Sequence, residues 1–366
     1  MVYVRVDGNV QIGMGHVMRT LSLADAMRKV GLPIYFLMSN QKGEGETAAE
    51  LVRQRGFDVI EIPYAYQEKD GEIPYLARTL AQFPTVFLVD SYAVTPEYLS
   101  ALRELGKVVY VDDLCEEIYP VDGILNYNIY AENLPYQERY AENKSLQEKA
   151  TKLFLGPQYA PIREAFVERR SAMEKEGKQK NGGQPLNVLF TTGGGDSLHI
   201  LPAIAEDLDK LLDGVTYHFL CGPLSEDGEK LTSMAQMYGP ERMVVHGPQE
   251  NMALFLNRFD LVVSAAGSTL YELCTLGIAT IGFSFVENQV QNLAGFAQQV
   301  GMPTAGAFDQ DMEKAKEKVF MLVREYLQED EKRQNLANRM ASLVDGMGAM
   351  RFAQEMKRIH EETRHS

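Results

Sequence analysis

The sequence predicts an α/β protein with two domains, each opened by a β-strand, a glycine-rich loop and an α-helix. Its 366 residues suffice for two hydrophobic cores, because domains commonly contain about 100–200 residues. Short β-branched runs alternate with segments of helical length, which is typical of parallel βαβ units with right-handed crossovers. We expect a first domain over residues 1–166, a second over 185–345, and a C-terminal helix in 346–366 that can pack back on the first domain.

The first βα unit carries the most informative histidine of the chain. Residues 2–7 form a β-branched run, a loop with Gly13 and Gly15 follows, and the segment 17–27 is helix-like, so His16 lies where the loop gives way to the helix. Ligands of open parallel sheets bind at the carboxyl ends of strands, and an imidazole titrates near neutral pH, so His16 is placed for acid/base chemistry. In the alternative interpretation, the two glycines shape a turn and His16 only caps the helix.

Polar side chains follow several predicted strands of the first domain. We expect strands at 33–38, 56–62, 85–90, 107–112 and 153–156, and helices at 48–55, 73–82 and 96–105. The polar strand ends are Asp7, Asp90 with Ser91 and Tyr92, Asp112 with Asp113, and Asn126 to Asn128. In a parallel sheet these ends share one edge beside His16. A single carboxylate at a strand end more often caps the next helix or turn, so the shared edge is the reason to expect a site there.

The second domain repeats the alternation after a polar segment. Residues 168–184 are charged and then rich in Lys, Asn and Gly, which is a linker composition. A strand at 186–192, the glycines 193–195 and a helix at 201–212 then open the second domain. Further strands are expected at 216–221, 243–246 and 261–264, a helix at 252–257, and a helical end from residue 312 with its last helix around 349–362.

A second candidate site lies in residues 264–292. The stretch from Ser264 to Thr269 places small and hydroxyl-bearing residues between a strand and a helix, where N–H groups and the helix dipole favour phosphate. Glu272 is the acidic partner of a capping box if Thr269 is the N-cap, and it can also accept hydrogen bonds from a ribose diol. The Asn and Gln residues of 287–292 supply uncharged donors and acceptors suited to sugar hydroxyls and amides.

Composition excludes several classes of protein. Hydrophobic residues make up 45% and charged residues 24% of the chain, as in ordinary globular proteins. The net charge of −15 argues against nucleic acid as a partner, because such binding depends on clustered Lys and Arg. No apolar run approaches the roughly 20 residues of a membrane helix and no basic leader precedes the first strand, so we expect a cytoplasmic protein without a membrane span.

The cysteines and histidines form no recognisable redox or metal motif. The cysteines are Cys115, Cys221 and Cys274, and they are odd in number, far apart and without CxxC spacing. His199, His218 and His246 share no HxxxH or HExxH spacing, so we interpret them as surface or strand-end residues. We therefore expect neither a metal nor a cofactor.

Three motifs in this order resemble a known family. They are Gly13-x-Gly15-His16-x-x-Arg19, Gly267-Ser268-Thr269-x-x-Glu272, and Glu287-Asn288-Gln289. They look like the nucleotide-sugar hydrolases of pseudaminic acid biosynthesis and the spore coat polysaccharide biosynthesis proteins of the G type. Both groups are similar to the lipid II-forming N-acetylglucosaminyltransferase. The resemblance spans most of residues 1–300 and also includes Arg5, Asp7, 89–92, 111–113, 126–130 and 159–166.

The resemblance implies two Rossmann-like domains that face each other across a cleft, the B-type glycosyltransferase (GT-B) architecture. It also implies hydrolysis of a UDP-sugar to UDP and a free acetamido deoxy sugar, with His16 as the base that deprotonates water for inverting attack on the anomeric carbon. Tyr92 and Asn288 would position the substrate. The further substrate-binding residues that it implies are Asp7, Gly13, Gly15, Arg19, Gly193, Gly194, Gly195, Gly267, Ser268, Thr269, Glu272, Gln289 and Asn292.

Two other functions fit the same motifs. An inverting glycosyltransferase would use His16 on an acceptor hydroxyl, and a nucleotide-sugar binding protein would keep the second-domain loop and leave His16 idle. The first domain has no obvious Lys/Arg-rich helix, which favours water or a soluble acceptor. The chain departs from the hydrolases at Pro161, in the long 168–184 segment and in its C-terminal tail, so the resemblance does not identify the sugar.

Overall fold

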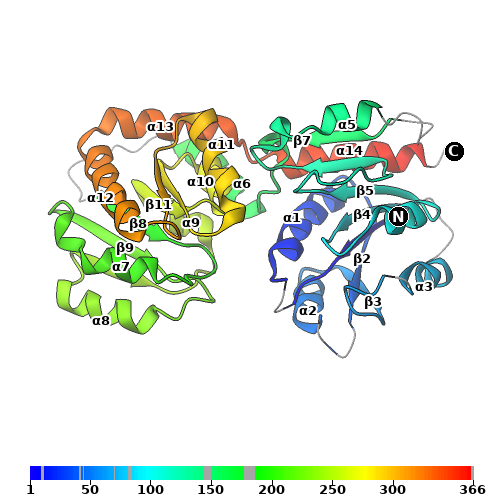
Figure 1. The fold of residues 1–366 in the computed structure, drawn as a ribbon, viewed down its shortest axis with the longest axis horizontal. Helices are drawn as coiled ribbons and strands as arrows, with labels where there is room; N and C mark the ends of the chain where they lie inside the picture. Colours follow the sequence, from blue (N-terminus) through cyan, green and yellow to red (C-terminus); the bar gives the residue numbers. More distant parts are fainter. Residues whose placement is uncertain are drawn as a thin grey trace. The chain divides into compact units, whose positions relative to one another are not determined.

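The chain forms two compact units, each with its own parallel sheet (Figure 1). The computed structural model describes residues 1–9, 12–40, 43, 45–69, 71–80, 85–142, 150–176 and 186–363. The first unit consists of Met1–Ile162 and Met347–Ser366, and the second of Arg163–Gly346. The parallel α/β character that the strand–helix alternation predicts is confirmed in both units.

The first unit contains a seven-stranded parallel sheet in the order β3-β2-β1-β4-β5-β6-β7. Its strands are β1 (Val2–Val6), β2 (Ile34–Ser39), β3 (Asp58–Ile62), β4 (Val86–Asp90), β5 (Lys107–Val111), β6 (Gly123–Asn126) and β7 (Lys152–Leu155). The chain runs outward from β1 to β3, then returns to the other side of β1 and continues from β4 to β7. The order therefore reverses between β1 and β4, and ligands of open α/β sheets bind at such a switch point.

Helices cover both faces of this sheet. They are α1 (Gly15–Lys29), α2 (Glu46–Gln54), α3 (Glu72–Thr79), α4 (Pro96–Arg103), α5 (Tyr136–Glu142) and α14 (Gly348–Glu362), with short 3-10 turns η2 (Ala131–Asn133) and η4 (Pro157–Tyr159). Strand residues alternate between the faces. Val2, Val4 and Val6 pack with α1, α2 and α14, whereas Tyr3 packs with α3 and α4 on the other face.

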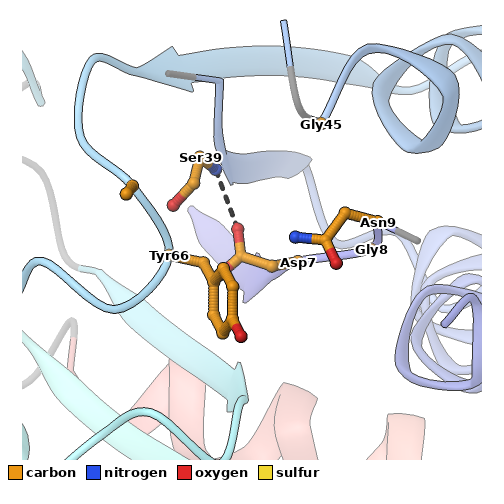
Figure 2. A pocket seen from close by; sticks show the side chains of 7 residues that line it. Asp7, Gly8, Asn9, Ser39, Gly45 and Tyr66 are labelled. Atoms are coloured by element: carbon orange, nitrogen blue, oxygen red, sulfur yellow. Dashed lines mark hydrogen bonds between the residues drawn. The ribbon is translucent and has the colours of Figure 1, made fainter. Parts of the chain in front are cut away.

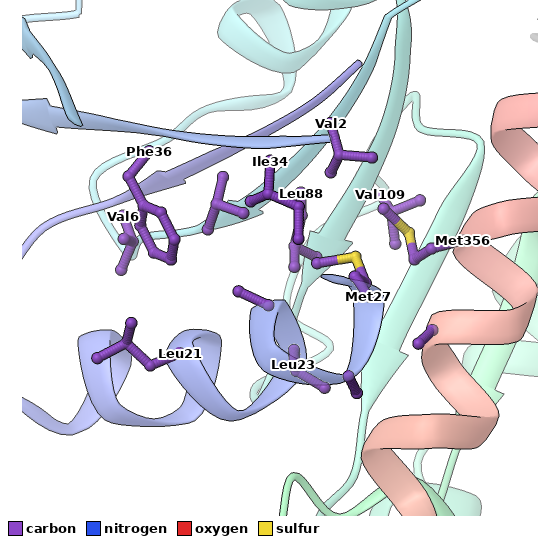
Figure 3. Packing of buried hydrophobic residues seen from close by; sticks show 14 of the residues in the cluster. Val2, Val6, Leu21, Leu23, Met27, Ile34, Phe36, Leu88, Val109 and Met356 are labelled. Carbon is purple, nitrogen blue, oxygen red and sulfur yellow. The ribbon is translucent and has the colours of Figure 1, made fainter. Parts of the chain in front are cut away.

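The last helix of the chain completes the first unit. α14, red in Figure 1, packs along α1. Figure 3 shows Met356 of α14 beside Val109 of β5 and close to Met27 of α1. Phe352 and Met356 are fully buried in this cluster, so the amphipathic face of α14 closes one side of the sheet.

The second unit repeats the arrangement with a six-stranded parallel sheet in the order β10-β9-β8-β11-β12-β13. Its strands are β8 (Leu186–Thr191), β9 (Val215–Leu220), β10 (Met243–His246), β11 (Leu261–Ala265), β12 (Thr280–Ser284) and β13 (Thr304–Ala307). Its helices are α6 (Glu164–Glu176), α7 (Ile200–Glu206), α8 (Gly228–Tyr238), α9 (Met252–Leu256), α10 (Thr269–Leu276), α11 (Val290–Val300), α12 (Met312–Gln328) and α13 (Asp330–Leu343), with 3-10 turns η5 (Leu208–Lys210) and η6 (Glu287–Gln289). The order reverses between β8 and β11, next to the glycines 193–195.

The prediction of a linker at residues 168–184 is wrong for the first half of that segment. Residues 168–176 belong to α6, which packs against α10 of the same unit. Arg170 donates to the carbonyl oxygens of Thr275, Ala341 and Val344, and these bonds anchor a helix whose surface is almost entirely polar. Tertiary contacts therefore override a composition that is typical of linkers. Residues 177–184 of the expected linker and 81–82 of the expected helix at 73–82 lie outside the described residues.

In the part of the chain that the structure describes, no helix has both the length and the apolar character required to cross a membrane.

Candidate active site

The switch point of the first sheet brings His16 and Asp90 together. His16 is the second residue of α1, which follows β1, and Asp90 is the last residue of β4. β1 and β4 pair in parallel with Val6 opposite Asp90, so the loop after β1 begins beside the end of β4. The two side chains come from positions 74 residues apart and meet with His16 Nδ1 2.6 Å from Asp90 Oδ1.

The His16–Asp90 contact fixes the tautomer of the imidazole. Burial alone would raise the pKa of Asp90, but Arg19 and His16 hold it below its ordinary value, so the carboxylate is ionised and can only accept hydrogen bonds. Nδ1 must therefore carry the proton that Asp90 accepts, so the lone pair of the neutral imidazole lies on Nε2. The alternative in which His16 caps the helix is wrong, because Met14 is the N-cap of α1 and no side chain caps it.

Arg19 lies one turn further along α1 and holds the dyad in place. Its Nε donates to Asp90 Oδ2 and its Nη2 to Asp90 Oδ1, both at 2.6 Å, in a bidentate fork. Its Nη1 donates to Asp113 Oδ2 at 2.8 Å. The guanidinium thus joins two carboxylates from neighbouring strand ends, which commits its donors to the protein.

Tyr92 and Asn128 complete the cluster around Asp113. Tyr92 Oη donates to Asp113 Oδ2 at 2.7 Å, and Asn128 Nδ2 donates to Asp113 Oδ1 at 2.9 Å. The Tyr92 ring meets the His16 ring edge-on, with centroids 4.8 Å apart. Although its hydroxyl is bound to Asp113, Tyr92 is 58% exposed, so it is the part of this cluster that a ligand can reach from solvent.

The strand ends do not all serve this cluster. Asp112 Oδ1 accepts from the backbone N–H groups of Leu114 and Cys115 at 3.0 and 3.1 Å, and Tyr136 donates to its Oδ2 at 2.8 Å. Asp112 therefore shapes the turn after β5, as strand-end carboxylates often do. This turn sets the path of the chain through Asp113.

Asp7 lies in a separate charged network. It forms a 2.7 Å ion pair with the fully buried Arg5, which in turn binds Glu72 of α3. Figure 2 shows the other Asp7 oxygen accepting from the backbone N–H of Ser39, at 2.8 Å, beside a small pocket that Tyr66 also lines. The resemblance implies that Asp7 binds substrate, but the negative charge of its carboxylate is already offset by Arg5.

The glycine loop of the second unit depends on close backbone packing. Gly193 has a φ of +85°, a left-handed conformation that favours glycine. Gly222 packs against this loop so closely that a Cβ there would lie 2.1 Å from the Gly193 carbonyl oxygen. Leu224 N–H donates to the Gly194 carbonyl at 2.9 Å, and Asp196 accepts from the first N–H groups of α7. The loop is therefore held by backbone contacts on one side.

The prediction of a capping box at the start of α10, with Thr269 as the N-cap, is wrong. Ser268 is the N-cap, without a side-chain cap hydrogen bond, and Thr269 is the first helical residue. Glu272 instead binds Arg163, whose Nε donates to Oε1 at 2.8 Å. Burial raises the pKa of Glu272 and Arg163 acts against that rise. Arg163 was not among the expected site residues; its only sequence signal is its place in the 159–166 stretch of the resemblance.

The amides of residues 288–292 have different environments. Asn292 is buried, where it accepts from Tyr271 Oη at 3.0 Å, and Gln289 Oε1 accepts from the Phe285 N–H at 3.1 Å. These two amides bond within their own unit. Asn288 lies exposed in η6.

Three further histidines, His199, His218 and His246, belong to the second unit and lie outside the cluster around His16 and Asp113. Exposed His199 binds Asp227 at 2.7 Å, and His218 stacks on His246 with Nδ1 and Nε2 2.9 Å apart. Within the described ranges, no group of three or more His, Cys, Asp or Glu side chains is arranged to hold a metal ion.

Comparisons with known proteins find relatives of the kind that the motifs resemble. No family model matches the chain. SpsG, a spore coat polysaccharide biosynthesis protein of Bacillus subtilis, is 22% identical over 301 residues, which are 80% of this chain and 80% of SpsG. The UDP-2,4-diacetamido-2,4,6-trideoxy-beta-L-altropyranose hydrolase of Campylobacter jejuni is 24% identical over 304 residues, which are 81% of this chain and 96% of that enzyme. An uncharacterized Methanocaldococcus jannaschii protein is 25% identical over 279 residues, 75% of this chain, which spans only 54% of that relative.

Solved structures agree on the fold. MurG of Acinetobacter baumannii superposes with a TM-score of 0.64 at 15% identity, covering 98% of this chain and 99% of MurG. The spinosyn rhamnosyltransferase SpnG has a TM-score of 0.58 at 14% identity, covering 96% of this chain and 99% of SpnG. The chain therefore has the two-Rossmann-domain GT-B fold, and its resemblance to SpsG and to the nucleotide-sugar hydrolases of pseudaminic acid biosynthesis is confirmed.

Proposed function

We propose that the protein is a UDP-sugar hydrolase that releases UDP and a free acetamido deoxy sugar by inverting attack of water at the anomeric carbon. The observation that carries this proposal is the 2.6 Å contact of His16 Nδ1 with ionised Asp90, which leaves Nε2 as a base. The likeness to the Campylobacter jejuni hydrolase supports water as the acceptor. Such a product would serve the synthesis of a nonulosonic acid or a surface polysaccharide.

The proposed reaction needs one proton transfer and one displacement. His16 Nε2 takes a proton from water while the water oxygen forms a bond to the anomeric carbon. The bond between that carbon and the diphosphate oxygen breaks, and UDP leaves with the electron pair. Asp90 offsets the positive charge that appears on the imidazolium, and Arg19 keeps Asp90 in position.

In this proposal, Tyr92 orients the sugar or the attacking water. Burial and the neighbouring Asp113 raise the pKa of Tyr92, so its hydroxyl stays protonated and cannot act as the base. Because its proton is directed to Asp113, its oxygen is available to accept a hydrogen bond from a sugar hydroxyl or from the attacking water. Its exposure makes that oxygen accessible.

We assign nucleotide binding to the second unit. The N–H groups at the start of α10, after Gly267, and the backbone of Gly193 to Gly195 would hold the diphosphate. Glu272 would accept hydrogen bonds from the ribose hydroxyls. Oriented N–H groups also stabilise the negative charge that develops on a departing diphosphate. The role of Asn288 as a substrate ligand rests on the resemblance and on its exposed position.

A panel of UDP-sugars tests the proposal directly. The purified protein is incubated with each UDP-sugar, with and without added acceptors, and released UDP is measured. The hydrolase releases UDP from at least one acetamido sugar in water alone. UDP release only in the presence of an acceptor would make the protein a transferase, and binding without turnover would leave it as a nucleotide-sugar binding protein.

A further inference from the structure

Arg163 and Glu272 form an ion pair inside the second unit. Arg163 Nε lies 2.8 Å from Glu272 Oε1, and Nη2 lies 2.6 Å from the same oxygen. Arg163 directly precedes α6, and Glu272 lies in the first turn of α10, against which α6 packs. Because the residues are 109 positions apart, the pair is built by the packing of the two helices and not by local sequence.

The guanidinium has a second contact that fixes its orientation. Arg163 Cζ lies 5.0 Å from the ring centroid of Phe166, which is buried at the start of α6. A cation above an aromatic face is held by the quadrupole of the ring. The Glu272 side chain keeps 15% of its surface exposed and that of Arg163 keeps 34%. A solvent-accessible carboxylate is thus held at one place by a rigidly supported arginine.

This arrangement suits the recognition of a vicinal diol. Both arginine contacts end on Oε1 of Glu272, and among the described residues no hydrogen bond to Oε2 is found. An ionised carboxylate accepts hydrogen bonds from both hydroxyls of a diol, whereas a protonated one would supply a donor instead. The positive charge of Arg163 also offsets that of the carboxylate, which would otherwise repel a nucleoside diphosphate at the start of α10.

We propose that Arg163 is a positioning residue for nucleotide recognition, and that it holds Glu272 so that the carboxylate selects the 2′,3′-diol of a ribonucleoside diphosphate. This inference rests on the proposed function and deepens it, because it names Arg163 as the residue that orients the ribose-binding carboxylate. Arg163 acts through Glu272, so its loss affects the recognition of the diol and not that of the base.

Calorimetric titration with UDP and dUDP tests the inference, because dUDP lacks only the 2′-hydroxyl. The wild-type protein should bind UDP at least about tenfold more tightly than dUDP, since hydrogen bonds to charged groups are stronger than neutral ones. In Arg163→Ala this preference should fall to about twofold or less, with dUDP affinity changed by less than about threefold. Arg163→Lys should restore part of the preference. Glu272→Gln should abolish it, and Arg163→Ala in that background should change it no further.

Arg170→Ala is the matched control. Arg170 lies in α6, which Arg163 directly precedes, and it donates to the carbonyl oxygen of Thr275 near the C-terminal end of α10 and to those of Ala341 and Val344. This variant should keep the wild-type UDP preference. An Arg163→Ala protein that keeps the preference, or that weakens UDP and dUDP equally, would overturn the inference. A wild-type protein that binds no uridine nucleotide would instead count against the proposed function.

Discussion

Tyr92 Oη donates a 2.7 Å hydrogen bond to Asp113 Oδ2, the oxygen that also accepts from Arg19. This bond ties an exposed phenol to a buried network of charges that ends at His16. Any group that contacts the Tyr92 oxygen is therefore placed by the same strand ends that orient the imidazole.

Replacing Tyr92 by Phe should lower kcat/KM by about three- to tenfold, because the ring contact with His16 survives and one hydrogen bond to Asp113 is lost. Steady-state kinetics of UDP release measures this. Tyr75→Phe is the control, since Tyr75 donates only to the Glu61 carbonyl on an exposed face of the same unit. Equal losses in the two variants would show that the Tyr92 hydroxyl has no specific role.

The variant His16→Asn should reduce kcat by about 10²–10⁴-fold and leave UDP affinity nearly unchanged, because a positioned base acts on the chemical step. Kinetics and calorimetry on the same protein separate these two effects. His199→Asn, in which an exposed histidine is removed, should behave as wild type. If His16→Asn kept kcat and raised KM, His16 would be a sugar ligand and Asp90 or another aspartate would be the base.

Asp90→Asn tests the orientation of the imidazole. An amide can donate to Nδ1, which favours the tautomer with the proton on Nε2, so kcat should fall by about 10²–10⁴-fold. Thermal unfolding must show that the variant is folded, since Arg19 loses its bidentate partner. Asp122→Asn removes a carboxylate that binds Arg103 and Lys107 in the same unit and should leave kcat unchanged. Full activity in Asp90→Asn would remove Asp90 from the mechanism.

Gly222→Ala should displace the glycine loop of the second unit. The new Cβ would lie 2.1 Å from the Gly193 carbonyl oxygen, so backbone would have to shift. We expect UDP affinity to fall by about tenfold and the free energy of unfolding by about 1–3 kcal/mol. Gly228→Ala is the control, because a Cβ there meets nothing within 4 Å. If Gly222→Ala bound UDP normally while being destabilised, the loop would be structural only.

The stacked pair His218 and His246 should make stability depend on pH. Burial, His246 and Arg258 lower the pKa of His218 from 6.5 to about 4, and the pKa of His246 is also lowered by burial. His218 thus stays neutral in the folded protein and protonates more easily when unfolded. Its contribution to stability is present above about pH 6.5 and is lost as the pH falls towards 4, by roughly 2–3 kcal/mol.

Chemical unfolding at pH 7, 5.5 and 4.5 measures this loss. His218→Gln should flatten the decline between pH 6.5 and 4.5 relative to wild type. His199→Gln should not flatten it, because bonding to Asp227 raises the pKa of His199 and its effect has the opposite sign. Identical slopes in wild type and His218→Gln would refute the prediction.

The parallel sheets could be predicted from the sequence because each strand is a short β-branched run followed by a helical segment. The helix α6 could not, because its polar surface is typical of a linker and its helical state depends on carbonyl partners from residues 275, 341 and 344. Local patterns report how a segment can fold, whereas distant contacts decide which fold it adopts.

The His16 loop could be identified from glycine spacing and its place after a strand. Its pairing with Asp90 required the order of the strands, because β1 and β4 are neighbours in the sheet although β2 and β3 lie between them in the chain. The contact between Arg163 and Glu272 could not be predicted either, because the packing of α6 against α10 brings together residues that are 109 positions apart in the chain. Asn292 shows the converse problem: its residue type suggests a ligand for sugar hydroxyls, but burial directs its amide to Tyr271.

The passage of the chain through the second unit before α14 completes the first has a consequence for biosynthesis. During synthesis the seven strands of the first sheet emerge first, but the helix that covers the cluster around Met27 and Val109 emerges last. Until then an apolar strip of the nascent first unit stays uncovered while the second unit can already fold. The first unit therefore reaches its native state only after the second unit has been synthesised, and shortening the chain before residue 348 would harm the unit that carries His16 more than the one that carries Glu272.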